Sequence, residues 1–202
     1  MAFSSRSPEL IKQQLKSMKL LMDFFEEKCG VKAYLNGGTL LGAIRDNNVI
    51  PHDNDYDINI LVPGDTIKQV RRNVSRICKI LQDNDLLYAL FVKGKSKQKK
   101  PVSERLFRLA SGQIHVETPD GKTFVDVWVS CFINDEYYSI QSIYKIMKKS
   151  DVVPLTVGTM MGIEFPVPRD SEKILEHLYG VDWRVPQDKK PVNKKRHLWD
   201  IV

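Results

Sequence analysis

The sequence has 202 residues, 42% hydrophobic and 28% charged, proportions typical of one soluble globular domain. Its formal net charge of +6 suits a phosphorylated substrate, a nucleic acid or an anionic surface as partner. No apolar stretch reaches the ~20 residues that cross a bilayer, and the N-terminus lacks the apolar core of a signal peptide. The three cysteines are widely spaced, so we expect a cytoplasmic protein with no disulfide framework and no membrane span.

Hydrophobic periodicity and turn residues predict the elements in chain order. We expect a helix over 8–30, a strand over 31–35, a short helix over 40–45, a strand over 55–62, a helix capped by Asp65 that runs to Leu81, strands over 86–92, 105–110, 114–117 and 123–129, a helix over 140–148, a hairpin around 158–162 and a helix over 172–179. The last three strands before the 140–148 helix are predicted to form an antiparallel meander.

Two aspartates at the start of the predicted strand 55–62 are the most informative pattern. Asp55 and Asp57 are two residues apart, so a strand would project both carboxylates from one face, where they could hold a hard cation. An EF-hand loop starting at Asp53 is excluded, because its required glycine and glutamate positions hold Ile58 and Gly64. A solvated acidic turn is the other alternative, and the apolar residues that follow disfavour it.

A glycine pair precedes these acids, and a further aspartate follows them. Gly37 and Gly38 can bring the backbone close to a ligand, and Thr39 can cap a short helix whose N-terminus favours an anion. Asp126 interrupts the apolar strand 123–129, although an exposed strand position would explain it too. This set suits metal-assisted transfer of a phosphorus-containing group, with Mg²⁺ as the expected ion and Mn²⁺ as a substitute.

Three further residues are candidate contacts to a substrate. Arg45 and Arg108 could clamp phosphate, although lone arginines are more often surface residues with buried stems. His52 could orient substrate or act as a base, and a structural hydrogen bond explains it equally well. The lysine-rich run 93–100 has no interleaved aromatic residues, which weakens a nucleic-acid-binding interpretation.

At these residues the chain resembles the LicD/fukutin-like family. The resemblance rests on runs distributed along the sequence: Gly37-Gly38-Thr39-Leu40-Leu41-Gly42-Ala43-Ile44-Arg45, Ile50-Pro51-His52-Asp53-Asn54-Asp55-Tyr56-Asp57, Phe107-Arg108, Val125-Asp126-Val127-Trp128, Phe165-Pro166-Val167-Pro168 and Tyr179-Gly180-Val181-Asp182-Trp183 with Pro186. His52 departs from the tryptophan that is common in the family, and Asn54 from the aspartate frequent in bacterial members.

The resemblance implies an α/β (α+β) fold with a nucleotidyltransferase-like mixed sheet flanked by helices. The whole chain, 1–202, is then one domain, with an N-terminal helix over 8–30, a catalytic core over 33–130 and a C-terminal extension over 131–202. Asp55, Asp57 and Asp126 match the metal-binding and catalytic acids of the family, and Asp53 is the additional aspartate of the motif. Gly37, Gly38, Thr39, Arg45, His52, Asp53 and Arg108 are then the candidate substrate-binding residues.

The expected activity is a Mg²⁺-dependent phosphotransferase of the EC 2.7 class. It would move phosphocholine, ribitol phosphate or a similar phosphorylated alcohol from a CDP-linked donor to a glycan or phosphorylated-sugar acceptor. The alternative enzyme is a nucleotidyltransferase that transfers NMP from an NTP to a small molecule, protein or RNA. The alternative from another class is a nucleic-acid-binding module without enzymatic activity, which retention of all the acids disfavours.

Overall fold

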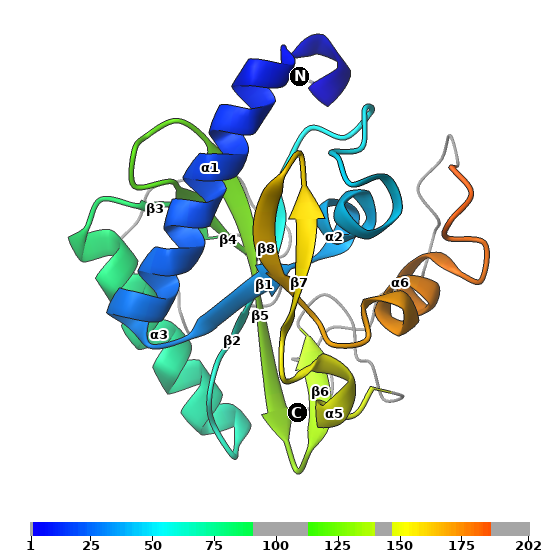
Figure 1. Cartoon of the computed structure of the whole chain (residues 1–202). Helices are drawn as coiled ribbons and strands as arrows, with labels where there is room; N and C mark the ends of the chain where they lie inside the picture. The colour runs from blue at the N-terminus through cyan, green and yellow to red at the C-terminus, as the bar shows by residue number, and fades with distance from the viewer. Residues whose placement is uncertain (1, 91–112, 140–146, 187–202) are drawn as a thin grey trace.

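The computed structural model describes residues 2–90, 113–139 and 147–186, and its centre is a six-stranded mixed sheet (Figure 1). The strands are β1 (Lys32–Leu35), β2 (Asp57–Leu61), β3 (Leu87–Leu90), β4 (Gln113–Glu117), β5 (Phe124–Ile133) and β6 (Glu136–Ser139). Their order is β1-β2-β5-β4-β3, with β6 also paired to β5. Only the β2–β5 pair is parallel among the described strands. The expected α/β fold, a mixed sheet flanked by helices in a single domain, is confirmed.

The helices and a separate hairpin surround this sheet. They are the 3-10 turn η1 (Phe3–Ser5), α1 (Pro8–Phe24), the π-helical turn η2 (Phe25–Cys29), α2 (Gly37–Leu41), the π-helical turn η3 (Gly42–Asp46), α3 (Ile67–Asp83), α5 (Lys149–Val152), α6 (Ser171–Tyr179) and the hairpin β7 (Thr156–Met160) and β8 (Ile163–Val167). Ser7 caps α1 by accepting a hydrogen bond from the N–H of Leu10 at 3.2 Å, as the Ser-Pro start predicts.

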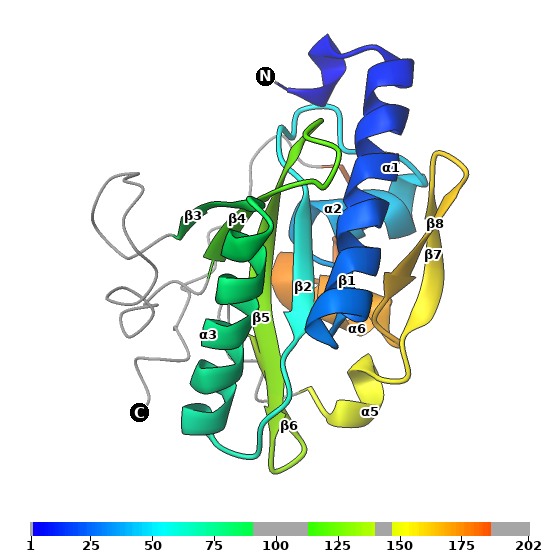
Figure 2. The same ribbon diagram turned by 90° about the vertical axis from the view of Figure 1, so that its left-hand side faces the viewer.

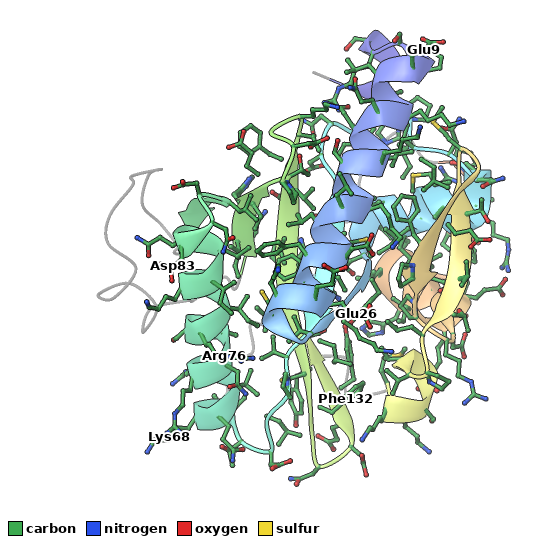
Figure 3. The ribbon with its side chains drawn as sticks, turned by 60° about the vertical axis from the view of Figure 1, so that its left-hand side comes forward. Glu9, Glu26, Lys68, Arg76, Asp83 and Phe132 are labelled. Atoms are coloured by element: carbon green, nitrogen blue, oxygen red, sulfur yellow. The ribbon has the colours of Figure 1, made fainter. Side chains whose placement is uncertain are left out.

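The two long helices pack beside different strands. α1 lies along β1 and β8, and α3 lies along β5 (Figure 2). Arg76 of α3 reaches the end of the α1–η2 segment, where its Nη2 donates to the carbonyl of Cys29 at 3.0 Å (Figure 3). Because both helices bury apolar side chains against the sheet and are tied to each other, this side of the sheet forms the structural core.

The two faces of the central strands differ in chemistry. Side chains alternate along a strand, so Ile58 and Val127 point to one face while Asp57 and Asp126 point to the other. The apolar face is fully buried, with Ile58, Ile60, Val127 and Val129 all 0% exposed. The opposite face carries Asp57, Asn59, Asp126 and Trp128. The candidate site therefore lies on the polar face of a sheet whose other face supplies the hydrophobic stabilisation.

Expected strand boundaries are wrong at β2 and β5, and β6 is a further strand that the sequence patterns do not predict. Strand β2 begins at Asp57 and leaves Asp55 in the preceding loop, because its ladder with β1 starts with the pair Leu35 and Ile58. Strand β5 continues past the expected end at Val129 and is followed by β6. The whole of the expected strand 105–110, residues 140–146 of the expected helix and residues 91–92 of the expected strand 86–92 lie outside the described residues.

The helix caps differ from expectation at two positions. Thr66, not Asp65, caps α3, since its Oγ1 accepts from the N–H of Gln69 at 3.3 Å and the Gln69 side chain accepts from the N–H of Thr66 in return. Helix α2 begins at Gly37, so Thr39 lies within the helix and does not cap it. Its hydroxyl oxygen instead accepts a hydrogen bond from the backbone of strand β2.

Two findings concern membrane-spanning helices and the cysteines. Within the residues described, no helix combines the length and apolar character that a membrane crossing needs. Cys29, Cys78 and Cys131 are all buried with free thiols.

Replacing Thr66 by alanine should lower the free energy of unfolding by about 1 kcal/mol, because the first turn of α3 loses its side-chain acceptor. Asp65→Ala is the matched control and should cost only a few tenths of that, since Gln69 bonds the backbone N–H of Asp65 and not its carboxylate. Urea denaturation of both variants measures the difference. Equal losses, or a larger loss for Asp65→Ala, would contradict the observed cap.

Candidate active site

Two aspartates face each other across the parallel strand pair. Asp57 at the start of β2 and Asp126 in β5 are register partners, and they lie on the same face of the sheet. The N–H of Asp126 donates to the carbonyl of Tyr56 at 2.8 Å, which fixes the register where the acidic segment enters the sheet. Main-chain pairing, and not side-chain attraction, therefore holds two carboxylates of like charge close together.

The Asp57 carboxylate is oriented by groups from two other elements. Its Oδ1 accepts a hydrogen bond from Trp128 Nε1 at 2.8 Å, and its backbone N–H donates to Thr39 Oγ1 at 2.8 Å. Gly37 adopts a φ of +54°, and a Cβ at that position would lie 2.7 Å from Asp57 Oδ2. Glycine is needed at this position both for its backbone conformation and for the space that the carboxylate fills.

Gly38 makes room for a second carboxylate in the same way. A Cβ there would lie 2.2 Å from Oδ2 of Asp53, a residue that is only 5% exposed. The expected contact of the glycine pair with a donor phosphate stays a prediction, and in the structure both glycines lie against carboxylates of the chain itself. The N-terminal end of α2, where the helix dipole favours negative charge, is thus next to Asp53 and Asp57.

Asp126 is held by two side chains of the neighbouring strand β4. His115 Nε2 lies 2.9 Å from Asp126 Oδ1, and Gln113 Nε2 donates to Asp126 Oδ2. Sequence reasoning missed both residues. The hairpin that joins β4 to β5 pairs Glu117 with Phe124. Counting back from that turn places His115 opposite Asp126, so the register of the hairpin is the signal that could have identified His115.

The charges of the neighbouring acidic residues repel that of Asp57. Burial raises the pKa of Asp57 to about 7, the hydrogen bond from Trp128 opposes that rise, and the charges of Asp55, Asp126 and Asp53 add to it. Asp55 also lines a small pocket that includes Gly38, Thr39 and Asp53. The expected single strand face for Asp55 and Asp57 is wrong, yet the loop still brings Asp55 within electrostatic range of Asp57.

The donor atoms of this cluster are all carboxylate oxygens, which suit a hard divalent cation such as Mg²⁺ or Mn²⁺. Among the side chains in the described ranges, no three Asp, Glu, His or Cys residues are already arranged to hold a metal ion. Trp128 donates to Asp57, while His115 and Gln113 contact Asp126. A cation bound by Asp57 and Asp126 would have to compete with these side chains for the carboxylate oxygens.

The other candidate substrate contacts are Arg45, His52 and Arg108. Arg45 in η3 pairs with its neighbour Asp46 through Nε and Nη2, at 2.9 and 2.7 Å. His52 is exposed in the turn before Asp53. Arg108 lies outside the described residues. The structure thus gathers the glycine pair, Thr39 and the acids in one place, while the predicted substrate contacts of Arg45, His52 and Arg108 stay predictions.

A mixed sheet with aspartates on adjacent strands, next to the Gly37-Gly38 start of α2, is consistent with a nucleotidyltransferase-like fold. The sequence profile for LicD/FKTN/FKRP, nucleotidyltransferase domain, matches residues 30–170, and the chain belongs to this family. No curated protein matches the chain. Family membership supports a phosphotransferase-type transferase in glycan or cell-surface modification.

Gly37→Ala should disturb the site far more than a comparable change elsewhere. Gly30 offers a matched control, because it has a φ of +69° and nothing within 4 Å of its Cβ position. Both variants incur backbone strain of roughly 1–2 kcal/mol, whereas only Gly37→Ala also displaces Asp57. We expect a larger loss in unfolding free energy for Gly37→Ala, and loss of any Mg²⁺-induced rise in melting temperature for that variant alone. Identical behaviour of the two variants would count against a carboxylate packed on Gly37.

Proposed function

We propose that this protein is a Mg²⁺-dependent transferase that moves a phosphorylated alcohol from a CDP-linked donor to a glycan or phosphorylated-sugar acceptor. Phosphocholine and ribitol phosphate are the leading candidates for the transferred group. The observation that carries the proposal is the register pairing of Asp57 with Asp126, with Asp53 and Asp55 within electrostatic range of Asp57 from the preceding loop. Such a concentration of carboxylates is unfavourable for folding by itself and is explained by a requirement for a cation.

Asp55, Asp57 and Asp126 are the proposed ligands of the metal, with Asp53 beside them. A bound divalent cation supplies charge neutralisation on the transferring phosphoryl group and on its leaving phosphate. Trp128 and Thr39 keep Asp57 in place, and His115 and Gln113 do the same for Asp126. These four side chains lower the cost of assembling the acids before the substrate arrives.

The proposed reaction breaks the phosphoanhydride bond of the donor and forms a phosphoester bond to the acceptor. The acceptor hydroxyl oxygen forms a bond to the distal phosphorus of the donor, the bond from that phosphorus to the bridging oxygen breaks, and CMP leaves. The hydroxyl proton passes to a carboxylate of the site or to water. Arg45 and Arg108 are the candidate contacts to the donor phosphates, and Arg45 would have to leave Asp46 to make one. Release of CMP, rather than pyrophosphate, distinguishes this activity from NMP transfer.

Asp57→Asn should abolish transfer without weakening the fold. The change keeps an acceptor for Trp128 and removes a buried ionisable carboxyl from beside three other acids, so the variant should melt at the same temperature as wild type, or higher, in EDTA. Asp83→Asn is the control, because Asp83 is an exposed residue of α3 and its replacement should leave transfer unchanged (Figure 3). Undiminished transfer by Asp57→Asn would remove Asp57 from the proposed metal ligands.

A thermal-shift screen with CDP-choline, CDP-ribitol, CDP-glycerol, CTP and ATP tests the donor class directly. Each nucleotide is compared with and without Mg²⁺, because a ligand that binds the native state raises the melting temperature. We expect stabilisation by at least one CDP-linked alcohol, dependent on Mg²⁺ and accompanied by CMP release when acceptor is added. Stabilisation by CTP or ATP alone, with pyrophosphate as product, would overturn the proposal in favour of NMP transfer.

A further inference from the structure

The N-terminal segment Phe3–Arg6 contacts the loop that carries the acids. This acidic loop, residues 51–56, joins the η3 segment to β2, and the N-terminal turn lies beside it at the top of the molecule (Figure 1). The N–H of Phe3 donates to the carbonyl of Asp53 at 2.7 Å, and the N–H of Ser4 donates to the carbonyl of Pro51 at 2.8 Å. The segment precedes residue 30, where the family profile begins to match.

Arg6 ties the acidic loop to helix α1. Its Nη2 donates to the carbonyl of Asn54 at 2.9 Å, and its Nη1 donates to Gln14 Oε1 at 3.0 Å. The planar guanidinium can serve both acceptors at once, a geometry that the single ammonium of lysine does not reproduce. The same Gln14 oxygen accepts from the Tyr56 hydroxyl at 3.2 Å, so both ends of the segment 54–56 are held from α1.

Phe3 packs against the acidic loop. Its ring centroid lies 4.8 Å from that of Tyr56, the Arg6 guanidinium lies 4.6 Å from its ring, and only 3% of Phe3 is exposed. Phe3 also lines the small pocket that contains Asp53 and Asp55. The aromatic contact and the two backbone hydrogen bonds thus act on the same short stretch of chain.

Asp53 and Asp55 have a greater need for such support than Asp57 or Asp126. Both lie in the acidic loop, outside any strand, whereas Asp57 and Asp126 are fixed by the β2–β5 ladder. Loop backbone opens locally more easily than a sheet, and metal affinity falls when carboxylates must be ordered on binding. Contacts from outside the loop are therefore the means of pre-organising these two acids.

We propose that Phe3–Arg6 is a positioning strap, which fixes the acidic loop so that Asp53 and Asp55 are pre-arranged for a divalent cation. Arg6 and Phe3 are positioning residues in this scheme, because they act through the loop. The inference rests on the proposed function for its consequence in catalysis. Its structural part, that the strap orders residues 51–56, stands by itself.

The test compares Arg6→Ala and Arg6→Lys with Arg72→Ala, an exposed arginine on α3. Hydrogen exchange followed by mass spectrometry reads the order of residues 51–57, and calorimetric titration reads the affinity for Mg²⁺. We expect faster exchange in 51–57 and about tenfold weaker Mg²⁺ binding for Arg6→Ala, with KM for the donor raised more than kcat is lowered. Arg6→Lys should resemble Arg6→Ala, and Arg72→Ala should resemble wild type.

Unchanged exchange in 51–57 for Arg6→Ala would overturn the strap. Wild-type behaviour of Arg6→Lys would also overturn it, because the positive charge alone would then suffice. Phe3→Leu, which preserves apolar contact with Tyr56, should retain more Mg²⁺ affinity than Phe3→Ala, and equal losses would contradict a packing role for Phe3. If wild type binds neither Mg²⁺ nor donor, the proposed function fails, and the exchange data still decide whether the strap exists.

Discussion

The parallel pairing of β2 with β5 is the constraint on which the site depends. It sets Asp57 opposite Asp126, and the main-chain ladder of both strands opposes the repulsion between these carboxylates. The fully buried apolar face of the same strands stabilises the ladder by removing Ile58 and Val127 from water. Hydrophobic burial on one face of the sheet thus offsets electrostatic cost on the other, because successive residues of a strand point to opposite faces.

The polar face continues beyond the acids as a buried hydrogen-bond network. The Tyr34 hydroxyl lies 2.6 Å from that of Tyr137 and 2.9 Å from Ser130 Oγ, and Asn59 Nδ2 donates to both tyrosine hydroxyls. This network joins β1, β2, β5 and β6, and a one-residue slip of β2 would replace Asn59 by an apolar side chain. The network therefore favours the one register that places Asp57 beside Asp126.

The sequence predicted those parts of the fold that local patterns determine. The helix periodicity of α1, α3 and α6 and the hairpin around 158–162 depend on residues close in the chain, and all four are confirmed. Asp126 was found because a carboxylate interrupts an apolar run, and the structure brings it to Asp57. The start of β2 and the packing of carboxylates over Gly37 and Gly38 depend on neighbours that single-residue patterns do not encode, which is why such patterns place Asp55 in a strand. His115 could be found only from the register of the β4–β5 hairpin, a signal that hydrophobic alternation alone does not use.

The glycine pair shows how one motif permits two physical explanations. Glycine beside a helix N-terminus suits a bound phosphate, and it equally suits a close carboxylate, because both are anions with oxygen atoms that need room. Here the Cβ positions of Gly37 and Gly38 are blocked by Asp57 and Asp53, so the requirement for glycine comes first from the acids. A donor phosphate at the helix end would lie beside those acids, and the proposed cation would offset the repulsion between their negative charges. The spacing between the glycine pair and the acidic run is therefore a packing requirement of the site, which precedes any contact with substrate.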